Sequence, residues 1–117
     1  MNSTHLVGTK GEEIALRFAQ SLGYKLYAQN VRLGRDEIDL ILFDPHDQVL
    51  VFLEVKTRSK RDRDFSVELN LTPAKKKKLF RSARAWIDRH EYEGSFRVDV
   101  IFVSEQLVTD HLKQLGE

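Results

Sequence analysis

Two runs of mostly apolar residues, 37–43 and 49–56, stand out in the middle of the chain. Both are rich in Ile, Val, Leu and Phe and are short enough to be strands. Residues 44–47 between them contain a proline and two aspartates, which favour a turn, so we predict a hairpin. Apolar residues at nearly every position are typical of strands that are covered on both faces.

Charged residues interrupt the two predicted strands, although charges are almost never fully buried unless they are paired or bind a metal. Because side chains alternate along a strand, Glu37 and Asp39 share one face, and Glu54 and Lys56 share one face. One interpretation is a salt bridge between Lys56 and either Asp39 or Glu54. The other is a divalent-metal site, since one lysine cannot balance three carboxylates and Mg²⁺ prefers carboxylate oxygens. The pattern alone leaves both interpretations open.

Residues 9–22 have the 3.6-residue period of an amphipathic helix. We predict that this helix follows a flexible tail of residues 1–7 and stops at Gly23. Glu12 lies on its apolar side and has two open roles: it could join the carboxylates of the hairpin, or reach back to Thr9 in a capping box. The apolar stripe consists of Ile14, Ala15, Phe18, Ala19 and Leu22.

A second helix is predicted after the polar stretch of residues 57–71, which is long enough to be a flexible functional loop. Thr72 is a good N-cap and Pro73 a good first helical residue, and the periodic pattern continues to about Arg89. This helix is basic on most of its surface. Its apolar stripe, which we assign to the core, consists of Leu79, Phe80, Ala83, Trp86 and Ile87.

Further strands are predicted on either side of these elements. Residues 24–31 form a strand at or near a sheet edge, and a turn at 32–36 joins it to the hairpin in a three-strand meander. Residues 96–103 form a fourth strand, and residues 104–116 are assigned a short terminal helix. The resulting fold class is α/β, in the order α-β-β-β-α-β, with a mixed central sheet flanked by helices.

Composition limits the classes of protein that fit. The 117 residues suit one domain, and 41% apolar with 32% charged residues indicate a folded chain. No stretch has the length of a transmembrane span and the N-terminus has no signal-peptide pattern, so we expect no membrane association. The absence of cysteine is compatible with a reducing compartment, and we expect a cytoplasmic protein.

The net charge of +1 conceals a segregation of charge along the chain. Residues 56–90 contain 12 Lys and Arg against 4 Asp and Glu, a net charge of +8, whereas the remainder carries −7. Such segregation suggests an anionic partner, although a Lys-rich helix can also be simply solvent-exposed. We expect the contacts to nucleic acid to come from Arg58, Lys60, Arg61, Lys75, Lys77, Lys78 and Arg81.

The order of elements, with Asp39 in the second strand and Glu54-x-Lys56 in the third, resembles the PD-(D/E)XK nuclease core of restriction endonucleases and archaeal Holliday-junction resolvases. More narrowly, the chain resembles the YraN family of bacterial proteins. The residues that carry this resemblance are Gly8-x-x-Gly11-Glu12-x-x-Ala15, Gly23-Tyr24, Asn30-x-Arg32, Glu37-Ile-Asp39-Leu-Ile41, Val51-Phe-x-Glu54-Val-Lys56-x-Arg58 and Arg97-x-Asp99-Val.

The resemblance implies a metal-dependent nuclease site. Asp39 and Glu54 would bind Mg²⁺ or Mn²⁺, with the backbone carbonyl of Val55 as a further ligand. Glu12 would approach from the first helix, directly or through water, and Lys56 would position the attacking water. Glu37 and Arg32 are expected as accessory residues.

The chain departs from the family pattern at two places. The family usually has Gly before Glu37, where this chain has Asp36, which adds a negative charge at the mouth of the site. A Phe-Gly pair that is usual after Arg58 appears as Phe65-Ser66. Both changes leave the fold assignment intact but weaken the case for catalysis.

Three functions remain open at this point. The first is a Mg²⁺-dependent endonuclease that hydrolyses phosphodiester bonds, in particular of branched or flapped DNA. The second is a non-catalytic nucleic-acid-binding module of the same fold. The third is a protein-interaction subunit whose basic helix meets an acidic partner. The oligomeric state is open, with a homodimer among the options.

Overall fold

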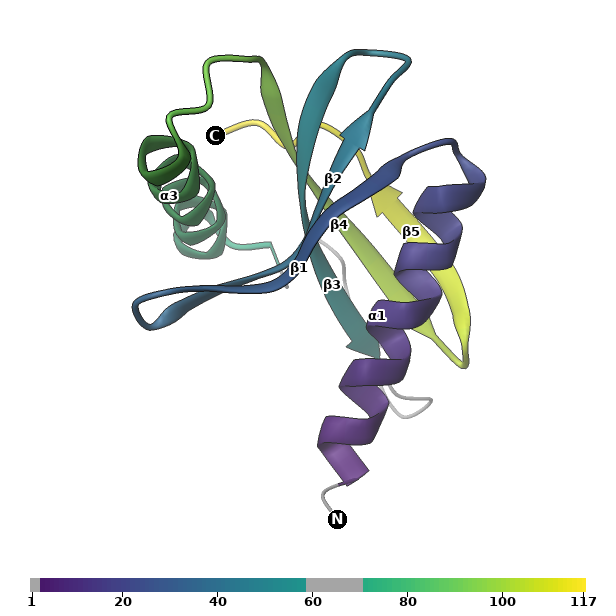
Figure 1. Cartoon of the computed structure of the whole chain (residues 1–117). Coiled ribbons are helices and arrows are strands. Elements are labelled where there is room, and N and C mark those ends of the chain that lie inside the picture. The colour runs from purple at the N-terminus through teal and green to yellow at the C-terminus, as the bar shows by residue number, and fades with distance from the viewer. Residues whose placement is uncertain (1–2, 59–70) are drawn as a thin grey trace.

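The computed structural model describes residues 3–58 and 71–117, with side chains from Lys10 onward in the first range. Within these residues the elements are α1 (Ser3–Ser21), β1 (Lys25–Leu33), β2 (Asp36–Asp44), β3 (Val49–Arg58), α3 (Pro73–His90), β4 (Phe96–Ser104) and β5 (Leu107–Leu112). The described strands form one sheet in the order β1-β2-β3-β4-β5, in which β3 and β4 run parallel and the other neighbours antiparallel. Helices α1 and α3 cover opposite faces of this sheet (Figure 1).

This architecture confirms the predicted α/β fold with a mixed sheet and the order α-β-β-β-α-β of a restriction-endonuclease-like core. Strands β1 to β3 form the predicted meander, with β1 at the edge. The segment between β3 and β4 contains α3, as a parallel crossover requires.

The central hairpin is covered on both faces, as its apolar pattern predicts. Leu40 pairs with Leu53 across β2 and β3, and both pack in the cluster that α1 covers. The next pair, Ile41 with Phe52, lies in the cluster that α3 covers. The turn begins at buried Asp44, whose carboxylate accepts a hydrogen bond from the backbone N–H of the residue two positions on, at 2.9 Å.

Helix α1 begins at Ser3, so the predicted start at Thr9 and the capping box between Thr9 and Glu12 are wrong. Of the predicted tail, residues 1 and 2 lie outside the described residues and the remainder belongs to this helix. A capping signal inside a sequence that can continue as helix does not by itself start one. The predicted stop is confirmed: Gly23 has φ of 93°, and the N–H of Tyr24 reaches back to the carbonyl of Ala19 at 3.1 Å.

Helix α3 has the predicted start. The side chain of Thr72 accepts the N–H of Lys75 at 3.3 Å, and Pro73 is the first helical residue. Trp86 is buried as predicted, with its ring 5.6 Å from that of Phe52, and His90 stacks on it at 4.2 Å between ring centroids. The apolar stripe therefore fixes which face of the helix meets the sheet.

The terminal helix predicted within residues 104–116 is wrong, because this segment contains the strand β5. Glu105 and Gln106 have φ of 52° and 66°, the two consecutive positive values of a tight hairpin turn. Neither residue is Gly or Asn, so the sequence carries no turn signal there. Thr57 and Arg58, which were predicted to belong to the loop of residues 57–71, are the last residues of β3. Residues 59–70 of that predicted loop lie outside the described residues.

A network of buried charged residues supports the sheet under α1, and the sequence analysis missed it. Nε of Arg97 lies 3.1 Å from Oδ1 of Asp99, and its Nη1 lies 2.9 Å from Oδ2 of Asp44. His111 contacts the other oxygen of Asp99 at 2.9 Å, and Arg97 donates to the hydroxyl of Tyr24. Each buried charge therefore has a partner, as a low-dielectric interior requires.

In the described part of the chain, no helix is both long enough and apolar enough to cross a membrane.

Candidate functional site

One cavity of about 410 Å³ collects the predicted catalytic side chains of the central hairpin. It lies between β2, β3 and α3. Arg35 and Ser82, which the sequence analysis did not select, also line it. The predicted residues on its wall are Glu37, Asp39, Glu54, Lys56, Lys75 and Lys78.

Asp39 lies just beyond the point where the pairing of β2 with β3 ends. The pairing begins at Asp44, opposite Val49, and its last pair is Leu40 with Leu53. One position further, Oδ2 of Asp39 accepts the backbone N–H of Val55 at 2.8 Å. Burial raises the pKa of Asp39, the hydrogen bond from Val55 acts against this, and the charge of Glu37 raises it again, so that the pKa lies above its usual value.

Glu54 and Lys56 form an ion pair, with Nζ 3.4 Å from Oε1. The side chain of Glu54 is 19% exposed and that of Lys56 is 35% exposed. Burial and the charge of Asp39 nevertheless raise the pKa of Glu54 to about 7, against the opposing effect of Lys56. A salt bridge that balanced the site would lower this pKa. The lysine is therefore present as predicted, but it does not compensate the two neighbouring carboxylates.

Glu12 adds a third acid close to this pair. Burial, together with the charges of Asp39 and Glu37, raises the pKa of Glu12 to about 7, against the opposing effect of a hydrogen bond with Asn30. The glutamate therefore lies within electrostatic reach of β2, although α1 packs on the other face of the sheet from α3.

Gly11 allows α1 to approach β3 closely, a role that the sequence analysis did not assign. A Cβ atom at this position would lie 2.3 Å from Oγ1 of Thr57, which is closer than side chains can pack. Glu12 is the next residue along the helix, so this contact helps to fix its position near the sheet.

The donor set suits a hard divalent cation bound by two carboxylates. Among the residues whose side chains are described, no three Asp, Glu, His or Cys side chains form a group that could hold a metal ion. Mg²⁺, however, is often bound by one or two carboxylates together with waters. Asp39 and Glu54 interact directly, and each carries a raised pKa. These two residues fit Mg²⁺ or Mn²⁺, whereas Glu12 contributes charge without completing a three-carboxylate group.

The basic residues predicted to bind nucleic acid divide between several places. Lys75 and Lys78 line the cavity of the carboxylates, whereas Lys77 lies in a separate groove on the outer side of α3. Lys60 and Arg61 fall outside the described residues. The separation of Lys75 and Lys78 from Lys77 follows from helical periodicity, because residues three apart share a face of a helix and residues one or two apart do not.

Two predicted arginines are engaged with carboxylates of the chain itself. Arg58 contacts Oδ2 of Asp110 on β5 at 2.9 Å, and its guanidinium lies 5.4 Å from the ring centroid of Phe102. Arg81 binds Asp36 with both its Nε and Nη2 atoms, at 3.1–3.3 Å. The extra charge of Asp36 at the mouth of the site is therefore neutralised by α3.

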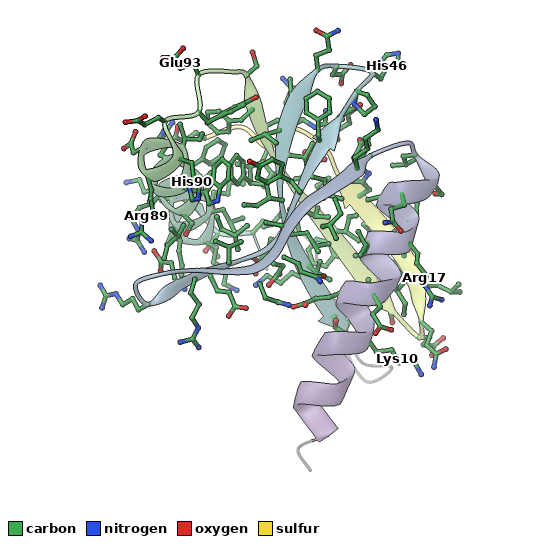
Figure 2. The ribbon with its side chains drawn as sticks, viewed as in Figure 1. Lys10, Arg17, His46, Arg89, His90 and Glu93 are labelled. Carbon is green, nitrogen blue, oxygen red and sulfur yellow. The ribbon has the colours of Figure 1, made fainter. Side chains whose placement is uncertain are left out.

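The accessory residues Arg32 and Glu37 face each other across β1 and β2. Both are exposed, and Glu37 also reaches the cavity wall. Two of the histidines, to which the sequence assigned no role, lie away from Asp39 and Glu54: Figure 2 shows His46 at the tip of the β2–β3 turn and His90 on α3.

Comparison with known proteins gives a consistent match over most of the chain. The family model described as "Uncharacterised protein family UPF0102" matches residues 11–103. A UPF0102 protein of Pelobacter propionicus is 38% identical over 98 residues, covering 82% of this chain and 69% of that protein. UPF0102 proteins of Prosthecochloris aestuarii and Mycolicibacterium gilvum are 39% and 38% identical, covering 85% and 83% of this chain and 76% and 79% of theirs. The matched segment includes every residue of the carboxylate cavity.

Proposed function

The chain belongs to the UPF0102 (YraN) family, and on that premise we propose that it is a metal-dependent endonuclease that hydrolyses phosphodiester bonds. The observation that carries this proposal is the pairing of Asp39 and Glu54 beside Lys56 in one cavity with cationic side chains on its wall. Asp39 and Glu54 lie in one recessed site, and the pKa of each is raised there. Such perturbed pairs of acids are typical of functional sites.

Asp39 and Glu54 would hold Mg²⁺ or Mn²⁺, with the carbonyl of Val55 as a further ligand. The hydrogen bond from the Val55 N–H already fixes one oxygen of Asp39, which leaves the other oxygen for the ion. A bound divalent cation supplies a water of lowered pKa and neutralises the charge of the phosphate. Glu12 adds negative charge that favours a cation at this point.

Lys56 would orient the attacking water or neutralise charge that develops on the phosphate. Its ammonium is anchored by Glu54 at 3.4 Å yet remains partly exposed, so substrate can reach it. Lys75 and Lys78 face the same cavity from α3 and would bind the phosphate groups beside the cleaved bond. The substrate in this proposal is DNA with branches or flaps, and the location is the cytoplasm.

A second candidate function is a non-catalytic nucleic-acid-binding module of the same fold. The observation that favours it is the lack, among the side chains described, of a three-acid group that could hold a metal. Under this alternative the cavity still attracts phosphate through Lys56, Lys75 and Lys78, but no bond is cut.

Cleavage of a panel of DNA structures with Mg²⁺ and with Mn²⁺ separates the two functions. We expect the wild type to cut at least one branched or flapped substrate and Asp39→Ala to cut none. Glu93→Ala, which removes an exposed carboxylate on the loop between α3 and β4, is the matched control and retains activity. Binding without cleavage by the wild type, or equal cleavage by Asp39→Ala, would overturn the nuclease proposal.

A further inference from the structure

The outer side of α3 carries a second cationic surface, whose lining residues differ from those of the carboxylate cavity. Lys77, Arg81 and Arg84 line a groove of about 560 Å³, together with Asp88 and Glu117. The three cations are spaced i, i+4 and i+7, so they share one face of the helix. At 1.5 Å per residue they extend over about 10 Å. One strand of a duplex carries a phosphate about every 3.4 Å along the axis, so this length spans about three phosphates.

Acidic side chains of the chain itself already engage two cations of this groove: Asp36 binds Arg81 and Glu117 binds Arg84. The carboxylate of Glu117 binds both Nη atoms of Arg84, one oxygen to each nitrogen. The hydrogen bond from Arg84 lowers the pKa of Glu117, and the charge of Lys77 acts in the same direction. A guanidinium binds carboxylate and phosphate with the same two-pronged geometry. The carboxylate of Glu117 therefore occupies the position on Arg84 that two oxygens of a phosphate group would take.

The chain segment that leads to Glu117 is anchored to the fold. Gln114 has φ of 58° and its N–H donates to Oδ1 of buried Asp99 at 2.9 Å. The N–H of Leu115 donates to the carbonyl of Val98 at 2.8 Å, and its side chain packs against the cluster under α3. Figure 1 shows this end of the chain returning beside α3. The position of Glu117 thus follows from contacts two residues before it.

We propose that the groove of Lys77, Arg81 and Arg84 is a second binding site for nucleic-acid backbone phosphates, and that Glu117 restrains it by occupying Arg84. The assignment of the anion to nucleic acid rests on the proposed function. In this arrangement the carboxylate cavity binds the phosphate at the bond that is cleaved, and the outer groove of α3 binds phosphates of the neighbouring nucleotides.

Binding of a labelled DNA oligonucleotide, measured in EDTA by fluorescence anisotropy over a range of salt concentrations, tests the proposal without any catalysis. An exposed ion pair is weak, so we expect Glu117→Gln to tighten binding about two- to fivefold at low salt. The slope of log K against log salt should become steeper by about 0.9, because Arg84 then neutralises one more phosphate. Glu93→Gln, which removes the same charge on the loop after α3 (Figure 2), should leave the slope unchanged.

Arg84→Gln completes the comparison. This change should weaken binding more in the Glu117→Gln background than in the wild type, where Arg84 is already occupied. If the wild type binds DNA and Glu117→Gln matches Glu93→Gln in affinity and slope, the groove proposal is wrong and the proposed function stands. If neither the wild type nor Glu117→Gln binds DNA at low salt, both fail. Tighter binding of Glu117→Gln to poly-glutamate than to DNA would assign the groove to an acidic protein segment and also overturn the proposal.

Discussion

Replacement of Glu54 by Gln should stabilise the metal-free protein. The pKa of Glu54 is raised from 4.5 to about 7, so the folded state disfavours the charged form. That difference corresponds to about 3 kcal/mol once the group is ionised. The attraction of Lys56 is already included in this raised pKa, and the partial exposure of the Glu54 side chain screens part of the energy. The net gain expected is about 1–2 kcal/mol, or on the order of 5 °C in Tm.

The sign of this effect depends on pH. Below pH 4.5 the glutamate is protonated in the folded and the unfolded state, so the wild type pays no penalty. As pH rises to about 7, the unfolded state loses its proton first and the wild type loses stability. Glu54→Gln should therefore match the wild type near pH 4.5 and exceed it at pH 8.

Thermal melts in EDTA at both pH values, with Glu93→Gln as the surface control, measure the difference directly. Mg²⁺ should then raise the Tm of the wild type by mass action and that of Glu54→Gln much less. A salt bridge that stabilises the fold predicts the opposite, because loss of Glu54 would leave Lys56 without its partner at a cost of several kcal/mol. A lower Tm of Glu54→Gln at pH 8 would refute the reasoning.

Three further predictions concern separate parts of the molecule. Lys56→Ala should abolish cleavage but retain Mn²⁺ binding, whereas Asp39→Asn should lose both; equal loss of metal in the two would favour a structural ion pair. Replacing Lys75, Lys77 and Lys78 together by Gln should reduce the salt dependence of DNA binding, and a slope equal to that of the wild type would contradict the phosphate contacts. Asp99→Ala should lower the free energy of unfolding in urea by about 3–5 kcal/mol, because it removes one partner of buried Arg97 and the partner of His111; a loss below about 1 kcal/mol would show that the network is not stabilising.

Local signals in the sequence were sufficient to predict the centre of the fold. The apolar runs of β2 and β3 identify a hairpin covered on both faces, and Gly23 and Thr72 end and start the helices where expected. The start of α1 could not be predicted, because the capping pattern at Thr9 occurs inside a longer helix. Strand β5 was missed because its turn at Glu105 and Gln106 uses residues that seldom adopt positive φ.

The candidate site was only partly predictable for a related reason. Strand alternation relates Glu37 to Asp39 and Glu54 to Lys56, but the contact between Asp39 and the Val55 N–H depends on where β2 leaves β3. The engagement of Arg58 depends on Asp110, which lies in the strand that was not predicted. Long-range contacts of this kind have no signature in the local pattern.

The central claim is that Asp39 and Glu54 together hold a divalent cation. Calorimetric titration of the protein with Mn²⁺ tests it most directly. We expect the wild type to bind one or two ions and Asp39→Ala/Glu54→Ala to bind none at this site, with Glu93→Ala unchanged. Equal Mn²⁺ binding by the double variant and the wild type would contradict the claim, because the ion would then be held elsewhere.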